Sequence, residues 1–244
     1  MRRLGRFWDK TERVHLKVCG IRNLDTAYSC YELGVDAIGL HVFGRPGGTP
    51  PCAYWTSLVP EEMSVFLLTN ETDPLALLEL CERLRCDTVQ IQGRKPPGEV
   101  RRVAEFMRPK GIAVVKSVGI GSEEGHDRPS EYIREIAGYV DAVLLDTAWR
   151  GGTGQFIDVN KARELAPFAA PAALIVAGGI SAANIGDVIC SLRPYGIDVE
   201  SSVEWVWERE GRRITAKSVK KIEELVRSLR LCNQMSRGPA TPGI

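Results

Sequence analysis

The chain has 244 residues, of which 44% are hydrophobic, and it carries 32 Lys or Arg against 31 Asp or Glu. The length fits one large α/β domain with a substantial core. A formal net charge of +1 excludes a strong field for nucleic acid or an anionic membrane, and no apolar run reaches the length of a membrane span. We therefore expect a globular protein that binds neither nucleic acid nor membrane.

The ends of the chain and its cysteines indicate a cellular compartment. The N-terminus is basic but lacks the apolar core of a secretory signal. Seven cysteines occur without a Cys-x-x-Cys pair, which favours reduced thiols in the cytoplasm over a disulfide framework or a zinc site. We expect an N-terminal extension at 1–13, one domain at 14–231 and a flexible tail at 232–244, with both ends poorly ordered.

Apolar runs and helical patterns alternate along the chain. Short continuous apolar runs, typical of parallel strands buried on both faces, predict strands at 15–19, 37–43, 64–68, 88–92, 112–116, 142–145, 173–177 and 197–200. Amphipathic patterns predict helices at 24–33, 74–84, 99–107, 131–137, 159–165, 183–192 and 219–229.

Eight such units form either a closed barrel or a doubly wound open sheet. The dinucleotide fingerprint G-x-G-x-x-G is absent after the first strand, which argues against the open sheet. We therefore predict a single (β/α)8 TIM barrel. Its active site belongs at the carboxyl ends of the strands, where glycine-containing loops follow the second, fifth and sixth strands.

A thiol and a carboxylate end two of the predicted strands. Cys19 ends the first and Asp146 ends the sixth, so in a barrel both face one mouth, where such a pair can move protons. Lys17 on the first strand either lowers the pKa of the thiol or pairs with a carboxylate inside the barrel. Plainer interpretations stay open: an inert buried cysteine, and a structural role for Asp146 in the loop that follows.

Glycines and serines follow the last two strands. Gly178 and Gly179 precede a helix, and Ser201 and Ser202 follow the eighth strand, which is where barrels hold phosphate. His41, inside the second strand, is either a scaffold group or a catalyst. The sequence shows only three histidines and no carboxylate cluster beside them, which argues against a metal site.

Several motifs together resemble one enzyme family. They are KVCGI at 17–21, GVDAIG at 34–39, DAVLLD at 141–146, GGTG at 151–154, AGGI at 177–180 and RPYGIDV at 193–199. Over roughly residues 15 to 230 the chain is similar to the phosphoribosylanthranilate isomerases, which are (β/α)8 enzymes of tryptophan biosynthesis.

The resemblance implies an aldose–ketose isomerase, an intramolecular oxidoreductase that needs no cofactor and no metal. It implies an Amadori rearrangement of N-(5-phosphoribosyl)anthranilate to 1-(2-carboxyphenylamino)-1-deoxyribulose 5-phosphate, by a monomer or homodimer. Asp146 matches the general acid and Cys19 the general base, with the phosphate on the glycines and serines above. Further expected substrate contacts are Lys17, His41, Arg45, Gln92, Gly152 and Gly154.

The chain departs from the family pattern on the aryl side of the site. The arginine that holds the anthranilate carboxylate has no match, although Arg45 lies close by in sequence. Gln92 stands where the family has histidine, the arginine after the fifth strand is absent, and Ser202 stands at a family glycine. Two alternatives therefore stay open: a divergent homologue that acts on a different phosphosugar or aryl amine, and a non-catalytic protein that binds a phosphorylated ligand.

Overall fold

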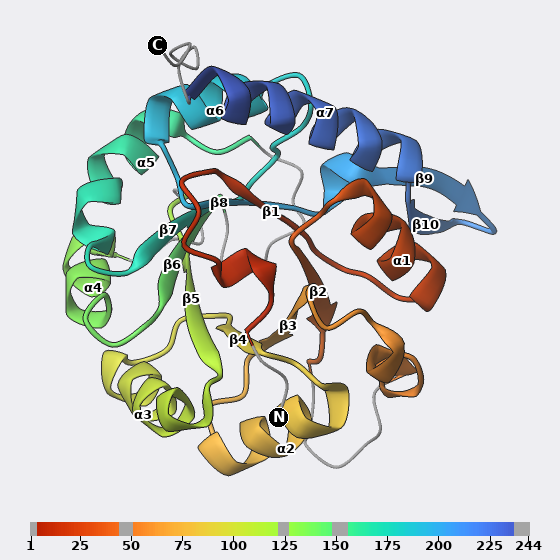
Figure 1. Cartoon of the computed structure of the whole chain (residues 1–244). Helices are drawn as coiled ribbons and strands as arrows, with labels where there is room; N and C mark the ends of the chain where they lie inside the picture. Colours follow the sequence, from red (N-terminus) through yellow and green to blue (C-terminus); the bar gives the residue numbers. More distant parts are fainter. Residues whose placement is uncertain (1–3, 44–50, 122–126, 148–155, 237–244) are drawn as a thin grey trace, which may run out of the picture.

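The computed structural model describes residues 4–43, 51–121, 127–147 and 156–236. Eight parallel strands close into a barrel in chain order, and helices surround it (Figure 1). The strands are β1 (His15–Val18), β2 (Ala37–His41), β3 (Ser64–Thr69), β4 (Thr88–Ile91), β5 (Ala113–Gly119), β6 (Ala142–Asp146), β7 (Ala173–Val176) and β8 (Gly196–Val199). The predicted (β/α)8 barrel is confirmed.

The helices of the described residues follow their strands closely. They are α1 (Leu24–Leu33), α2 (Pro74–Leu84), α3 (Pro97–Met107), α4 (Pro129–Ile136), α5 (Val159–Leu165), α6 (Ile185–Leu192) and α7 (Val219–Ser236). Side-chain oxygens of Asn23, Asp73 and Asp158 accept backbone N–H groups in the first turns of α1, α2 and α5. Between β2 and β3 the described residues form two short 3₁₀ turns, Pro51–Tyr54 and Thr56–Leu58, instead of an α-helix.

The strands bury both faces, and alternate residues point into the barrel. Side chains such as Phe66, Val115 and Leu144 form an inner cluster, while a larger outer cluster packs against the helices. In the register of the strands, Lys17 of β1 lies opposite Ala37 of β2 on one side and opposite Asp198 of β8 on the other. Two residues further toward the mouth on each strand, the next inward-facing layer therefore contains Cys19, Gly39 and Glu200.

Residues 4–13 cross the amino-terminal end of the barrel, where Figure 1 shows the red N-terminal segment over the ring of strands. Phe7 is fully buried, with its ring centroid 5.0 Å from that of Phe66 and 5.8 Å from that of Tyr195. Trp8 Nε1 donates a 2.8 Å hydrogen bond to Thr88 Oγ1. The expectation of a poorly ordered N-terminal extension is therefore wrong for residues 4–13, because their aromatic side chains close the barrel floor.

The first residues of the expected C-terminal tail are helical. Helix α7 continues to Ser236, and the Asn233 side chain accepts from the Val14 N–H at 2.9 Å and donates to the Val14 carbonyl at 3.1 Å. Residues 232–236 are thus part of a helix held to the barrel, and residues 237–244 lie outside the described residues.

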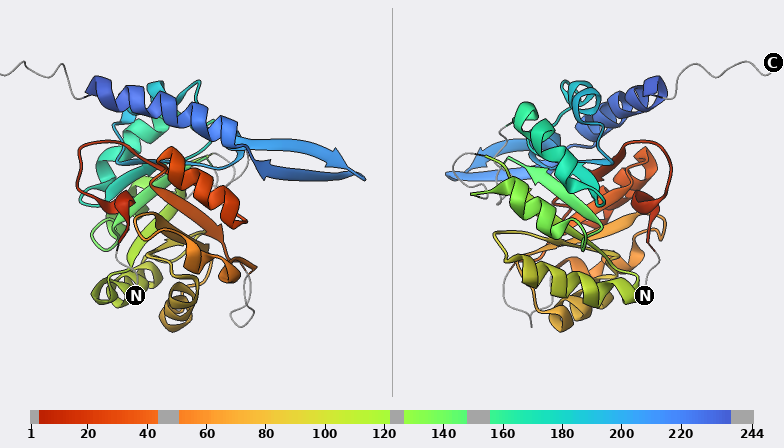
Figure 2. Two further views of the ribbon diagram at one scale, coloured as in Figure 1. Left: turned by 45° about the vertical axis from the view of Figure 1, so that its right-hand side comes forward. Right: turned by 90° about the vertical axis from the view of Figure 1, so that its left-hand side faces the viewer.

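A hairpin that the sequence patterns did not reveal separates β8 from α7. Strands β9 (Glu204–Arg209) and β10 (Arg212–Lys217) pair antiparallel and project away from the barrel beside α7 (Figure 2). Trp205 and Trp207 are 56% and 45% exposed on it. Strong β-propensity at these tryptophans is the signal that was available in the sequence.

Within the described part of the chain, no helix has both the length and the hydropathy to cross a membrane. All seven cysteines are free thiols.

We expect Phe7→Ala to lower the free energy of unfolding by about 3–5 kcal/mol, because it leaves a cavity where an aromatic ring fills the barrel floor. Urea denaturation followed by circular dichroism measures the change. Leu4→Ala, at a side chain that is 47% exposed, is the control and should stay within about 0.5 kcal/mol of the parent. Equal stability of the parent and Phe7→Ala would show that the N-terminal segment does not hold the barrel.

Candidate active site

Cys19 directly follows β1 and points into the barrel mouth. Its backbone N–H donates to the Val199 carbonyl at 2.8 Å, which continues the ladder between β1 and β8. The side chain is 2% exposed and lies against Gly39 of β2. A Cβ at Gly39 would lie 2.7 Å from Cys19 Sγ, a separation that real Cβ atoms do not show. Glycine at position 39 therefore leaves the space that the thiol occupies.

Two side chains face the thiol from the neighbouring strands. His41 Nε2, at the end of β2, lies 3.4 Å from Cys19 Sγ. The same ring nitrogen lies 3.4 Å from Glu200 Oε2, just after β8. The sequence-based reasoning missed Glu200 as a site residue; it noted no carboxylate cluster beside the histidines, and the structure places this carboxylate beside His41. The available signal was the strand alternation, since Glu200 lies two residues after the inward-facing Asp198.

Lys17 forms an ion pair inside the barrel. Its side chain is fully buried, and Nζ lies 2.6 Å from Asp198 Oδ2. Burial disfavours the ammonium form, but the charges of Asp198 and Cys19 and the hydrogen bonds to both together outweigh it, so the pKa of Lys17 lies above its ordinary value. Of the two roles expected for Lys17, the structure shows the pairing with a carboxylate, and the positive charge remains near Cys19.

Cys19 rests as a thiol. Burial raises the pKa of Cys19 well above its ordinary value, and the positive charge of Lys17 opposes this shift. The negative charges of Asp198 and Glu200 reinforce it. Lys17 does lower the pKa of Cys19, as the sequence suggested, but burial and the two carboxylates outweigh the positive charges of Lys17 and Lys217.

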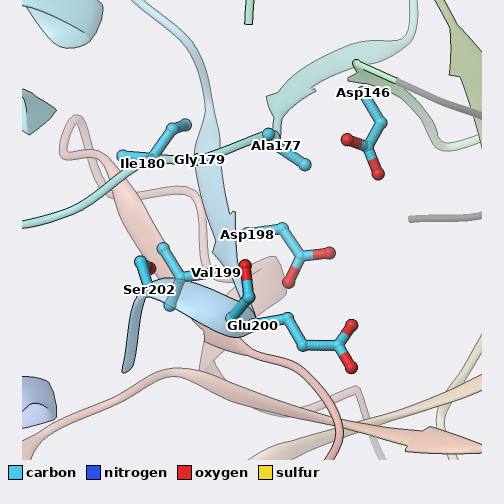
Figure 3. A pocket seen from close by; sticks show the side chains of 10 residues that line it. Asp146, Ala177, Gly179, Ile180, Asp198, Val199, Glu200 and Ser202 are labelled. Carbon is cyan, nitrogen blue, oxygen red and sulfur yellow. The ribbon is translucent and has the colours of Figure 1, made fainter. Parts of the chain in front are cut away.

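Asp146 ends β6 on the opposite side of the mouth, and in Figure 3 its carboxylate and those of Asp198 and Glu200 project into the same space. Burial raises the pKa of Asp146 to about 7, and the charge of Asp198 adds to the rise. The Thr147 N–H, which donates to Asp146 Oδ1 at 2.7 Å, opposes it. A carboxyl group with this pKa can deliver a proton near neutral pH.

A pocket opens beside Asp146 along the ends of β7 and β8. Its lining residues are Asp146, Ala177, Gly178, Gly179, Ile180, Asp198, Val199, Glu200, Ser201 and Ser202. The Ser202 hydroxyl is buried and has no hydrogen-bond partner among the described residues. A buried, unpartnered hydroxyl is costly unless a ligand pairs with it.

Gly178 shapes this pocket through its backbone. Its φ of 98° lies in the region that favours glycine, and a Cβ there would collide with Thr147 Oγ1. Gly179 follows with a φ of 59°. The structure thus brings all four predicted phosphate residues, the two glycines and the two serines, to one pocket.

The structure describes only some of the other residues expected to contact the substrate. Gln92 directly follows β4, half-buried, and its backbone N–H donates to the Thr69 carbonyl at 2.8 Å. The strand alternation puts its side chain on the inner face. Arg45, Gly152 and Gly154 lie outside the described residues.

The arrangement offers an acid, a thiol base and an anion pocket within one barrel mouth. These groups suit proton transfer to and from a phosphorylated small molecule.

Comparison with known proteins agrees with this geometry. A family model described as N-(5'phosphoribosyl)anthranilate (PRA) isomerase matches residues 56–226. The N-(5'-phosphoribosyl)anthranilate isomerase of Moorella thermoacetica is 33% identical over 221 residues, which cover 86% of this chain and 92% of that protein. The corresponding protein of Methanosarcina acetivorans is 32% identical over 232 residues, covering 87% and 93%.

A solved structure shares the fold as well. Phosphoribosyl anthranilate isomerase from Thermus thermophilus matches with a TM-score of 0.68 at 27% identity, over 89% of this chain and 99% of that one. On these matches, the chain belongs to the N-(5'-phosphoribosyl)anthranilate isomerase family.

Proposed function

We propose that this chain is the isomerase of tryptophan biosynthesis that converts N-(5-phosphoribosyl)anthranilate to 1-(2-carboxyphenylamino)-1-deoxyribulose 5-phosphate, with Asp146 as acid and Cys19 as base. The observation that carries the proposal is Asp146, a carboxyl group with a pKa of about 7 at the carboxyl end of β6, in the same barrel whose β1 is followed by Cys19. Membership of the isomerase family supports the reaction.

The chemistry uses these two groups in sequence. Asp146 protonates the ring oxygen of the ribofuranose, the bond from this oxygen to C1′ breaks, and a Schiff base forms. Cys19 then removes the proton on C2′, which gives an enolamine. Tautomerisation of the enolamine yields the aminoketose, so C1′ is reduced and C2′ is oxidised within one molecule, and no external oxidant or reductant is needed.

Catalysis requires Cys19 as a thiolate while Asp146 keeps its proton. This protonation state is the minor one, because the pKa of the thiol is raised and that of Asp146 is about 7. Lys17 stabilises the thiolate, since its ammonium group is among the charges that lower the pKa of Cys19. Lys17 is thus a positioning residue for the base.

The phosphate of the substrate belongs in the pocket at the ends of β7 and β8. The backbone around Gly178 and Gly179 and the hydroxyls of Ser201 and Ser202 line it. The unpartnered Ser202 hydroxyl gains a hydrogen bond when a phosphate oxygen arrives. This contact anchors the substrate at a distance from the reacting carbons.

We infer that the partner of this site is a phosphorylated small molecule and that the reaction uses no cofactor. Neither nucleic acid nor membrane takes part, and the enzyme acts in the cytoplasm as a monomer or homodimer. The near balance of positive and negative side chains and the seven free thiols support this setting.

One observation favours a second substrate. Although burial opposes it, the neighbouring His41 lowers the pKa of Glu200 to about 2, so this carboxylate is ionised at the mouth. A fixed negative charge repels a benzoate carboxylate that comes near it. An N-phosphoribosyl aryl amine without a carboxylate is therefore the alternative. Comparing kcat/KM for phosphoribosylanthranilate and phosphoribosylaniline decides between them.

We expect Cys19→Ala and Asp146→Asn each to lower kcat by about 10²–10⁴-fold, the usual contribution of a positioned acid or base. Loss of phosphoribosylanthranilate fluorescence measures the rate, and circular dichroism checks folding. Cys30→Ala, at another buried thiol in α1, is the matched control and should keep parental activity. Full activity of Cys19→Ala would exclude the thiol as base, and a folded parent without turnover would favour the binding-protein alternative.

Ser202→Ala should raise KM by about 10-fold or more with little change in kcat, because a hydrogen bond to an ionised group is lost in ground state and transition state alike. Steady-state kinetics give both constants. Ser29→Ala, at a half-buried serine of α1 far along the chain from this pocket, should leave them unchanged. Unchanged KM in Ser202→Ala would place the phosphate elsewhere.

The pH profile of kcat/KM should be half-risen near pH 7, reach a plateau above it, and fall again above the raised pKa of Cys19. Below the plateau both groups hold protons, and above it neither does. Glu200→Gln removes a negative charge that raises both pKa values, so both limbs should move to lower pH. Glu79→Gln, a remote exposed carboxylate, is the control. Limbs that stay in place in Glu200→Gln would contradict this account of the site.

A further inference from the structure

Three potential metal ligands converge at the barrel mouth from three neighbouring strands. Cys19 Sγ follows β1, His41 Nε2 ends β2, and a Glu200 carboxylate oxygen follows β8. All three atoms lie within 4.8 Å of one another. The separation between Sγ and Nε2 is 3.4 Å, and that between Nε2 and Oε2 is 3.4 Å.

These separations match those between ligands of a tetrahedral zinc ion. Zinc binds sulfur at about 2.3 Å, imidazole nitrogen at about 2.0–2.1 Å and carboxylate oxygen at about 2.0–2.2 Å. Tetrahedral angles then place sulfur and nitrogen about 3.6 Å apart, and nitrogen and oxygen about 3.3–3.4 Å apart. The sulfur and the carboxylate oxygen, which lie within 4.8 Å of each other, would have to come to about 3.6 Å for the site to close around an ion.

The contact of Cys19 Sγ with His41 Nε2 is a hydrogen bond, but the same ring nitrogen does not pair well with the Glu200 carboxylate as well. The thiol and the carboxylate both face one ring nitrogen, Nε2, which carries either one proton or one lone pair. The 3.4 Å separation from the Glu200 oxygen also exceeds the usual 2.7–3.2 Å of an N–H···O bond. A cation placed between the three atoms would satisfy them together.

The surroundings favour a positive ion. Near the mouth, the described residues provide more carboxylates than ammonium groups: Asp146, Asp198, Glu200 and Glu204 against Lys17 and Lys217. The two lysines lie in ion pairs with Asp198 and Glu204. An entering dication therefore meets a net negative charge even before the thiol ionises.

Solvent reaches the cluster from the open side of the barrel. The side chains of His41 and Glu200 are 38% and 25% exposed, whereas Cys19 lies beneath them at 2%. An ion can thus approach the imidazole and the carboxylate first and then the sulfur. The fourth position faces the mouth and is available to water.

We propose that Cys19, His41 and Glu200 form a binding site for a divalent metal ion of the zinc class, and that the bound ion inhibits the isomerase. On binding, the thiol proton passes to solvent and the sulfur coordinates as a thiolate, with no change in oxidation state. A thiolate–imidazole–carboxylate set selects Zn²⁺ or Co²⁺ over Mg²⁺ and Ca²⁺. The inhibition rests on the proposed role of Cys19 as base, but the binding does not.

The test titrates Co²⁺ into the chelator-treated full chain and follows the near-ultraviolet charge-transfer band of a cobalt thiolate. We expect one ion per chain, displacement by Zn²⁺ and no band with Cys19→Ser. His41→Phe and Glu200→Gln should each weaken Zn²⁺ binding by at least 10–100-fold, the loss seen on removing outer-shell partners. Cys190→Ser, at an exposed thiol, is the matched control and should keep the band.

Absence of the band at saturating Co²⁺ would overturn the site, and so would a band that survives both His41→Phe and Glu200→Gln. Activity assays keep the two proposals apart. If the metal-free protein turns over its substrate but gives no cobalt band, the isomerase proposal is supported and the metal site is excluded. If the cobalt band appears and the variants behave as expected, but the protein shows no turnover, the metal site is supported and the isomerase proposal is excluded.

Discussion

The buried ion pair between Lys17 and Asp198 sets the charges of the whole barrel mouth. Parallel pairing of β1 with β8 places the two residues opposite each other inside the barrel. Removing one partner of such a pair costs about 3–5 kcal/mol, because the other charge is left buried and unpaired. The pair also acts on both proposed catalytic groups, since Lys17 favours the Cys19 thiolate and Asp198 favours protonated Asp146.

The same carboxylates impose a compromise on the site. Asp198 and Glu200 help to keep a proton on Asp146, as a general acid requires, but they also disfavour the thiolate that a general base requires. The negative field that creates this conflict is also what attracts a cation to Cys19. Isomerase chemistry and metal binding therefore compete for one sulfur atom, and the competition follows from the charge of the mouth.

One end of the barrel stabilises the fold and the other carries the candidate active site, as is usual for this fold. At the amino-terminal end, Phe7 and Trp8 fill the floor and contact β3, β4 and the start of β8 through packing and one hydrogen bond. At the carboxyl end, polar side chains and glycines leave open space. Stability at the floor lets the mouth hold buried charge and an unpartnered hydroxyl, both of which are costly to the fold.

The local pattern of the chain was enough to predict the barrel and several groups at its mouth. Cys19, Asp146 and the glycines at 178 and 179 each end or follow an apolar run, and in a parallel barrel every such end faces the same way. Position along the chain therefore placed them at the mouth.

Contacts across the barrel could not be read in this way. The pairing of His41 with Glu200, the ion pair of Lys17 with Asp198 and the burial of Phe7 join segments far apart in the chain. They depend on the register between β1, β2 and β8, and a shift of one residue would turn every side chain to the opposite face. The apolar pattern of a strand buried on both faces does not encode that register. Closure of the barrel fixes it, and so places a histidine and a carboxylate beside the thiol.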